Sequence, residues 1–278
     1  MPRRPADSHI FWRDPALPHL EAREVMDGRT VCYVPHSHPT FSIGAITGGH
    51  SEYLTGDERH AAFEGTVVLM NPEMVHACNP VDDQPWSYRM LYADTGWLTD
   101  VQGAAAFRPY GAVISRDPGL YADLMGLFDL LFDEGGTAKD AAARAFFAGL
   151  GNRVDGTAAV VRDEHAALSL AADYIALHCT RELRVEEVAE AAGLSPSYLI
   201  RAFKARYGLT PHAYQTNLRI RAGQEGLRKG QPIVEVALDA GFADQAHFQR
   251  VFKAHTAATP GQFAQSAARQ HGEGAERQ

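Results

Sequence analysis

Three histidines near the start of the chain have the types and spacing to do chemistry. His36 and His38 are two positions apart, and His76 follows the turn at Asn71-Pro72. Side chains at i and i+2 of an extended strand point to the same face, so His36 and His38 can converge on one ligand. Imidazole nitrogens bind divalent metals, and three of them leave a coordination position open. They also hydrogen-bond organic molecules without metal, and a purely structural role is the third interpretation.

Other polar groups lie near these histidines. Tyr53, Tyr88 and Tyr92 fall at alternating strand positions, where they either line the same pocket or form core. Cys32 and Cys78 flank the histidines, as thiolate ligands or as buried inert thiols. The chain has only 3 cysteines, too few for a disulfide framework, which fits a reducing compartment. Because we find neither a secretory leader nor an apolar run of membrane-spanning length, we expect a cytoplasmic protein that makes no membrane contact.

A second group of reactive side chains is cationic and occurs twice. Arg201, Phe203 and Lys204 recur as Arg250, Phe252 and Lys253, 49 positions later. These two triplets belong to a longer internal repeat, in which residues 185–211 match residues 233–260. Before the turn the offset is 48, so the second copy has one additional residue in its turn. Arginine can bind guanine in a bidentate manner, and both cations can bind phosphates.

Each copy of the repeat predicts a helix-turn-helix, with motif one over 185–207 and motif two over 233–254. A short helix precedes a glycine, and a second helix begins after Ser195 or Asp244 as N-cap. The pairs Leu199/Phe203 and Phe248/Phe252 are spaced i,i+4 and should face the core. The opposite faces then carry Ser197, Arg201 and Lys204 in one copy and His247, Arg250 and Lys253 in the other.

The charge distribution decides between DNA binding and a plain helical bundle with solvated basic faces. The formal net charge of −8 and the pI near 5.9 argue, for the chain as a whole, against nucleic acid. Residues 166–270 nevertheless carry net +3, whereas residues 1–165 carry net −10. Together with the duplicated basic helix, this partition favours double-stranded DNA as a partner of the back half.

The patterning that must position these residues changes along the chain. Short segments punctuated by Gly, Pro, Asn and Asp over about 25–113, among them 30–35, 40–49 and 51–56, are expected as strands and predict a strand-rich barrel or sandwich. Helical periodicity follows, and Leu120, Leu124, Leu127 and Leu131 form a stripe that either a second copy or the chain's own domains cover. We therefore expect an α+β multidomain fold, with a sensing domain over 1–115, a helical connector over 116–163, an all-α domain over 164–270 and a polar tail over 271–278.

The back half resembles the AraC/XylS family of bacterial transcription regulators. The resemblance rests on GFADQAHFQRVFKAHTAATPGQF and covers both repeats; Ala257 departs from the family's usual Gly, and Ala246 and His247 from its common Ser and Tyr. It implies a long helix over 211–229 bridging the two motifs. It also implies DNA contacts from two helices, and RNA polymerase as a partner. The implied base contacts are Ser197, Ile200 and Arg201 in motif one and Gln245, Ala246, His247 and Arg250 in motif two, with Lys204, Arg206 and Lys253 near phosphates.

The front half resembles the cupin barrel that serves as the sensory domain of such regulators. PHSH and GTVVLMNPEMVHACNP correspond to its two motifs. The resemblance implies a small-molecule effector bound by His36, His38, Tyr53, His76, Tyr88 and Tyr92. Metal-binding cupins commonly add a Glu after the first histidines, and Pro39–Ser42 supplies none. A divalent metal on His36, His38 and His76 stays open as a cofactor, as does homodimerisation. The main interpretation is a regulator without catalytic activity, and the alternative is a metal-dependent cupin enzyme with a DNA-binding appendage.

Overall fold

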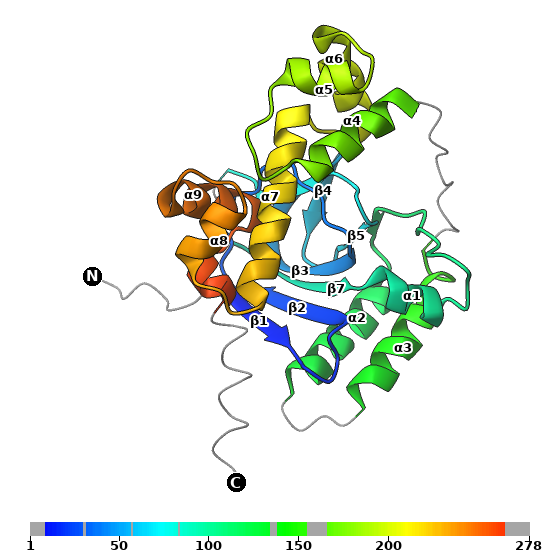
Figure 1. The fold of residues 1–278 in the computed structure, drawn as a ribbon. Helices are drawn as coiled ribbons and strands as arrows, with labels where there is room; N and C mark the ends of the chain where they lie inside the picture. The colour runs from blue at the N-terminus through cyan, green and yellow to red at the C-terminus, as the bar shows by residue number, and fades with distance from the viewer. Residues whose placement is uncertain are drawn as a thin grey trace. The chain divides into compact units, whose positions relative to one another are not determined.

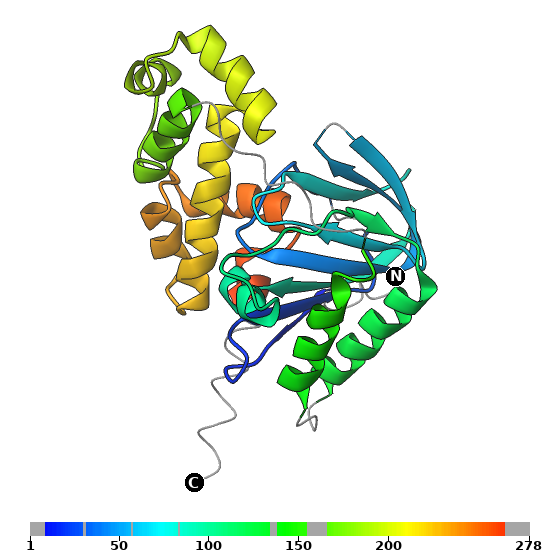
Figure 2. The same ribbon diagram turned by 90° about the vertical axis from the view of Figure 1, so that its right-hand side faces the viewer.

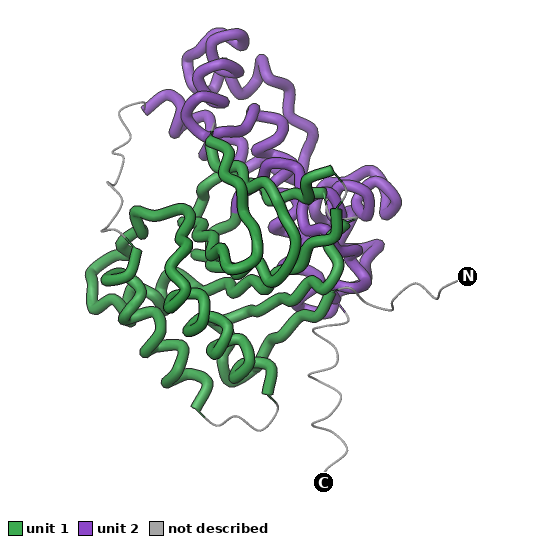
Figure 3. The backbone as a smooth tube through the Cα atoms, turned by 180° about the vertical axis from the view of Figure 1, so that it is seen from behind, with its two compact units in different colours: residues 1–32, 38–160, 268–278 green, residues 33–37, 161–267 purple. Residues whose placement is uncertain are grey.

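The computed structural model describes residues 9–29, 32–56, 58–82, 84–133, 138–154 and 166–264. The chain divides into two compact units (Figure 3). Residues 1–32, 38–160 and 268–278 make up the first, and residues 33–37 and 161–267 make up the second. The expected tail over 271–278 and the expected boundary near 163–164 lie outside the described residues. Among the described helices, none has both the length and the apolar character needed to cross a bilayer.

The first unit is built on an antiparallel sheet of eight strands (Figure 1). Its main path runs β1-β2-β7-β3-β5-β8, and β4 and β6 each pair with β3. The strands are β1 His9–Arg13, β2 Leu20–Val25, β3 Phe41–Thr55, β4 Glu58–Phe63, β5 Val67–Met70, β6 His76–Pro80, β7 Trp86–Ala93 and β8 Ile114–Ser115. The strand-rich front half is thus confirmed, and the sheet also uses β1 and β2, which precede the segment expected to form strands.

The longest strand, β3, continues through the glycine pair Gly48-Gly49. The segments before and after Gly48-Gly49 are expected as two strands, but β3 runs through them for 15 residues. The pairing of β3 with β7 shifts register between Ile46 and Gly48. A bulge bends a strand without ending it, which explains the apparent break. The strand expected over 30–35 is absent from its described part, residues 32–35.

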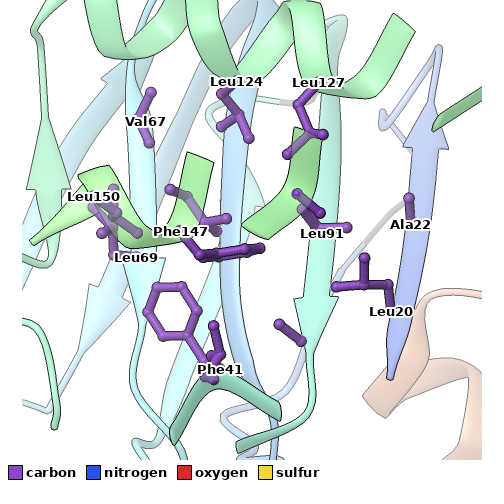
Figure 4. Packing of buried hydrophobic residues seen from close by; sticks show 14 of the residues in the cluster. Leu20, Ala22, Phe41, Val67, Leu69, Leu91, Leu124, Leu127, Phe147 and Leu150 are labelled. Atoms are coloured by element: carbon purple, nitrogen blue, oxygen red, sulfur yellow. The ribbon is translucent and has the colours of Figure 1, made fainter. Parts of the chain in front are cut away.

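Two helices expected as a connector belong to the core of the first unit. α2 (Pro118–Phe132) and α3 (Lys139–Leu150) lie side by side on one side of the sheet (Figure 2). The stripe of Leu120, Leu124, Leu127 and Leu131 is at most 5% exposed. Figure 4 shows Leu124 and Leu127 pointing towards the sheet, in the same cluster as Phe147 of α3. The stripe therefore packs on its own unit, and α2 and α3, which were expected to connect two domains, are part of the first unit. A shorter helix, α1 (Thr95–Val101), follows β7.

The second unit is helical. Its helices are α4 Ala166–Leu177, α5 Val185–Ala191, α6 Pro196–Tyr207, α7 Pro211–Arg228, α8 Ile233–Asp239 and α9 Gln245–Thr256. α5–α6 and α8–α9 are the two expected helix-turn-helix motifs, and α7 is the expected bridging helix. α7 approaches the second motif closely, because a Cβ on Gly223 would lie 2.7 Å from the Phe248 ring.

Polar side chains of α7 fix the neighbouring loops of the helical unit. Gln215, only 5% exposed, donates through Nε2 to the carbonyls of Cys179 (3.0 Å) and Arg181 (2.7 Å). Asn217 donates to the Ser37 carbonyl (3.1 Å) and accepts from the Ser37 amide (3.3 Å). The contact of Asn217 with Ser37 explains why residues 33–37 group with the helices. Buried amides that each bond to two backbone groups hold those segments in one arrangement.

Candidate nucleic-acid interface and ligand-binding residues

The second helix of each motif begins at the expected cap. Ser195 accepts a hydrogen bond from the Tyr198 amide (3.4 Å), and Asp244 accepts one from the His247 amide (2.7 Å). Leu199 and Phe203 in α6, like Phe248 and Phe252 in α9, are completely buried. Burial of these i,i+4 pairs fixes which face of each helix points outward.

The outward faces carry the residues that the repeat singled out. Ser197, Ile200, Arg201 and Lys204 are exposed on α6, and Ala246, Arg250 and Lys253 are exposed on α9. Three other expected contacts, Arg206, Gln245 and His247, are half-buried. The Arg206 guanidinium lies over the Tyr207 ring, and the His247 ring packs edge-on against Phe242. Packing therefore already uses part of the surface of Arg206 and of His247.

The exposed cations of the two helices are available for an anionic partner. Arg201, Lys204, Arg250 and Lys253 form no salt bridge with any residue in the described part of the chain. By contrast, Arg181 of the loop before α5 pairs with Glu187, and that pair lowers the pKa of Glu187 to about 2. Cations without carboxylate partners on both second helices are what phosphate and base-edge contacts require.

In the first unit, the structure brings His38 and His76 together. Their ring centroids are 4.9 Å apart, and the Tyr92 ring lies 5.5 Å from His38. Nδ1 of His38 lies 2.9 Å from the Thr40 carbonyl, and Nδ1 of His76 lies 2.8 Å from the Met74 carbonyl. A backbone carbonyl accepts a hydrogen bond from Nδ1–H, so the neutral His76 ring has Nε2 as its acceptor. Burial lowers the pKa of His76 to about 3, with a further contribution from His38, so His76 is neutral at pH 7.

His36 does not complete a three-histidine site. It belongs to residues 33–37 of the helical unit, stacks on Tyr33 and has Nδ1 2.9 Å from the Val34 carbonyl. Within the described ranges, no group of three or more His, Cys, Asp or Glu side chains is arranged to hold a metal ion. The described residues around His38 and His76 do not fit the metal of a metal-binding cupin.

Tyr53, Tyr88 and Cys78 are core residues. Tyr53 is fully buried and donates to the Leu69 carbonyl (2.9 Å), and burial raises the pKa of its phenol. Tyr88 is 3% exposed and stacks on Trp86. Burial raises the pKa of the Cys78 thiol to about 11, so the thiol is protonated at neutral pH, and its Sγ lies 3.4 Å from Oγ of Ser51.

Ser42 is a neighbour of the histidine pair that inspection of the sequence missed. Its hydroxyl lies 3.3 Å from Nε2 of His38, and in the sheet it pairs with Tyr92 of β7 and Met70 of β5. Serine is common in strands and carries no motif, so only its even spacing from His38 could have indicated this position.

These features define a class of protein: a two-unit DNA-binding regulator in which a sheet-based unit accompanies a duplicated helix-turn-helix. Residues 18–150 match the family of AraC-like ligand binding domains, and residues 188–266 match a helix-turn-helix domain family. The chain belongs to the AraC-type transcription regulators, with an N-terminal ligand-binding domain and a C-terminal helix-turn-helix domain.

Two proteins of similar sequence are named as helix-turn-helix transcriptional regulators, and one solved structure is similar in fold. The chain is 23% identical over 84% of its length to the uncharacterised helix-turn-helix regulator YbfI of Bacillus subtilis, 87% of which is covered. It is 36% identical over 83 residues to MtrA of Neisseria gonorrhoeae, which is 30% of this chain and 28% of that one. ToxT of Vibrio cholerae O395 is similar in fold, with a TM-score of 0.56 at 12% identity over 94% of this chain and 98% of that one.

Proposed function

We propose that the helical unit binds operator DNA by placing α6 and α9 in successive major grooves. The observation that carries this proposal is the repeated pair of exposed, unpaired cations, Arg201 with Lys204 and Arg250 with Lys253. Arg201 and Arg250 contact guanine edges, because a guanidinium matches the two acceptors of guanine. Five further side chains complete the base contacts: Ser197, Ile200, Gln245, Ala246 and His247. The phosphates are neutralised by Lys204, Arg206 and Lys253.

Fluorescence anisotropy with an operator selected from random DNA tests the assignment. Arg250→Ala should weaken operator binding by about 1–3 kcal/mol and relax the base preference at one position. Lys204→Ala should weaken all sequences alike and lower the salt dependence by about one counterion. Arg144→Ala, which removes an exposed arginine of the first unit, is the matched control. Equal loss on operator and random DNA for Arg250→Ala would contradict base contact.

We propose that a small-molecule effector acts through the first unit, with His38, His76 and Tyr92 among the groups that sense it. The contacts of the His38 ring with the rings of His76 and Tyr92 support the proposal. A ToxT structure from Vibrio cholerae strain SCE256, with a TM-score of 0.55 at 13% identity over 94% of this chain and 96% of that one, contains an unsaturated fatty acid. An apolar organic acid is therefore the first effector class to try. His76→Ala should abolish the reporter response while apo-protein still binds the operator.

We propose further that the protein acts as a homodimer in the cytoplasm, without catalytic activity of its own. A groove of about 370 Å³ separates the outer edges of α2 and α3. Its lining includes the small residues Ala122, Gly126, Ala142, Ala145 and Gly149. A helix of a second copy fits such a surface. A Cβ at Gly126 would meet no atom of the described residues within 4 Å, so Gly126→Leu should block dimerisation without unfolding. Sedimentation equilibrium measures the outcome.

RNA polymerase is the proposed protein partner. α8 exposes Val234 (53%) and Leu238 (57%) beside Glu235 and Asp239. An apolar pair flanked by carboxylates suits a basic protein surface. Val234→Ser combined with Leu238→Ser should lower transcription in vitro while operator affinity is unchanged. Loss of operator affinity would instead place α8 against DNA.

A further inference from the structure

The first unit contains a hollow that neither the histidine pair nor the sheet explains. It has a volume of about 290 Å³ and lies where the end of α1, the loop over residues 102–110 and the end of α3 meet. Its lining includes apolar side chains from Val101 and Phe147 and polar groups from Gln102, Arg108, Tyr110 and Asn152. Since one water occupies about 30 Å³ of liquid, this volume accommodates about ten waters or one small ring compound.

The phenol of Tyr110 is buried at this hollow without a hydrogen bond. Tyr110 is 3% exposed, and its Oη has no hydrogen-bond partner among the residues that the structure describes. The residue itself is held firmly. Its amide donates to Oδ1 of Asn71 (3.0 Å), its carbonyl accepts from Nδ2 of Asn71 (2.8 Å), and its ring packs 4.8 Å from that of Phe41. A buried hydroxyl that lacks a partner destabilises the empty site, and a ligand that accepts its proton removes that cost.

Arg108 provides a cation beside this phenol. Gln102 fixes the loop, since its Nε2 donates to the Arg108 carbonyl (2.9 Å) and its Oε1 accepts from the Arg108 amide (2.8 Å). The guanidinium donates through Nη2 to the Gln102 carbonyl (2.6 Å). Arg108 forms no salt bridge within the described ranges, and no carboxylate lines the hollow. The remaining guanidinium N–H groups therefore have no anionic partner there.

The protonation state of Tyr110 suits a donor. Burial raises the pKa of the phenol, while the Gln102 amide and the Arg108 charge act in the opposite direction. The phenol therefore stays protonated at neutral pH. Because Gln102 already uses its amide on the Arg108 backbone, the Oη proton is left for a ligand.

We propose that this hollow is a binding site for a small aromatic carboxylate, with the carboxylate on Arg108 and Tyr110 and the ring against Phe147 and Val101. The lining combines two donors, the Arg108 guanidinium and the Tyr110 phenol, with the apolar side chains of Val101 and Phe147, and this combination suits a planar organic anion. The proposal deepens the small-molecule response proposed above by naming a ligand class and a second location. The binding claim itself does not depend on DNA binding, which is measured separately.

Titration calorimetry of the full chain with benzoate and with trans-cinnamate tests the site. We expect saturable binding of at least one, and at least about ten-fold weaker binding of the uncharged analogue benzamide, because a charge-assisted hydrogen bond is lost. Tyr110→Phe removes only the hydroxyl and should weaken carboxylate binding by about ten-fold, as should Arg108→Gln. Tyr121→Phe and Arg59→Gln are matched controls outside the hollow and should leave the affinity unchanged.

The outcomes separate this site from the proposed function. Absence of binding by both carboxylates up to their solubility would overturn the site, as would equal affinity for benzamide or for the Tyr110→Phe variant. Tyr110→Phe is expected to fold, since it removes a buried group that lacks a partner, and its circular dichroism checks this. Operator affinity without ligand should be the same for all four variants. A loss of operator affinity with unchanged carboxylate binding would contradict the DNA contacts proposed for the helical unit and would not contradict the binding site in the hollow.

Discussion

The turns of the two helix-turn-helix motifs contain matching glycines that the structure uses differently. Gly193 and Gly241 both have positive φ, at 67° and 82°. A Cβ at Gly193 would meet nothing within 4 Å, whereas a Cβ at Gly241 would lie 2.0 Å from the Thr180 carbonyl oxygen. Thr180 belongs to the loop before the first motif. The close approach at Gly241 therefore ties the second motif to the first, and we predict unequal effects of the same substitution.

The magnitudes follow from the two geometries. Gly193→Ala incurs only the cost of placing a Cβ in the left-handed region, about 1–2 kcal/mol. Gly241→Ala incurs that cost and also displaces the Thr180 backbone, which adds about 1–3 kcal/mol. Urea unfolding followed by circular dichroism at 222 nm reports on the helices. Trp12, Trp86 and Trp97 are the chain's 3 tryptophans and all belong to the first unit, so their fluorescence serves as an internal control.

Gly241→Ala should shift the dichroism transition further than Gly193→Ala, and neither should shift the tryptophan transition. Gly241→Ala should also lower operator affinity more than Gly193→Ala, because the two recognition helices lose their fixed spacing. Equal destabilisation by the two substitutions would refute the role assigned to the Gly241–Thr180 contact. A larger shift in tryptophan fluorescence than in dichroism would show that the wrong unit was affected.

Further predictions concern a helix cap, a buried histidine and a buried amide. Ala257 has φ 54° at the helix C-cap that matches Gly208 (φ 71°), and glycine adopts this left-handed conformation at less cost than alanine. Ala257→Gly should therefore raise the free energy of unfolding by about 0.5 kcal/mol, and Gly208→Ala should lower it by about 1–2 kcal/mol. A lower Tm after Ala257→Gly would contradict this. The pKa of His76 is about 3 when folded and 6.5 when unfolded, so only the unfolded chain binds this proton between those values. The free energy of unfolding should therefore decrease as the pH is lowered, by about 2 kcal/mol between pH 8 and pH 5. In urea titrations, His76→Gln should flatten this pH dependence. An unchanged pH dependence in that variant would exclude His76 as its source. Gln215→Ala removes one of two donors from the Cys179 and Arg181 carbonyls, because Arg219 also donates to both, and should cost about 0.5–1.5 kcal/mol, measured by dichroism; an effect above about 3 kcal/mol would mean that Arg219 does not hold these carbonyls alone.

The sequence predicted the helical unit closely because its signals are local and occur twice. The caps at Ser195 and Asp244 and the buried pair Phe248/Phe252 follow from spacing within one or two helical turns. Repetition of the whole pattern then distinguished a DNA-binding motif from an ordinary amphipathic helix. The contact of Gly241 with Thr180 was out of reach, because both glycines of the repeat look alike in sequence and only one has a distant backbone against it.

The first unit was harder to predict because its contacts connect distant segments. The leucine stripe of α2 was equally compatible with a partner or with the chain's own sheet, and tertiary packing decided for the sheet. His36 and His38 share a strand-like spacing, but no strand forms over the described residues 32–35, so the expected convergence of three histidines failed. The hollow at Tyr110 combines side chains from residues 101 to 152 and carries no sequence motif at all.

Hydroxyl-radical footprinting of the operator tests the central claim most directly, namely that α6 and α9 bind as two linked recognition helices. The structure predicts two protected segments on one face of the DNA, about one helical turn or 10–10.5 base pairs apart. Arg201→Ala should weaken protection chiefly in one segment and Arg250→Ala chiefly in the other. A single protected segment, or equal loss of both segments in each variant, would contradict the account.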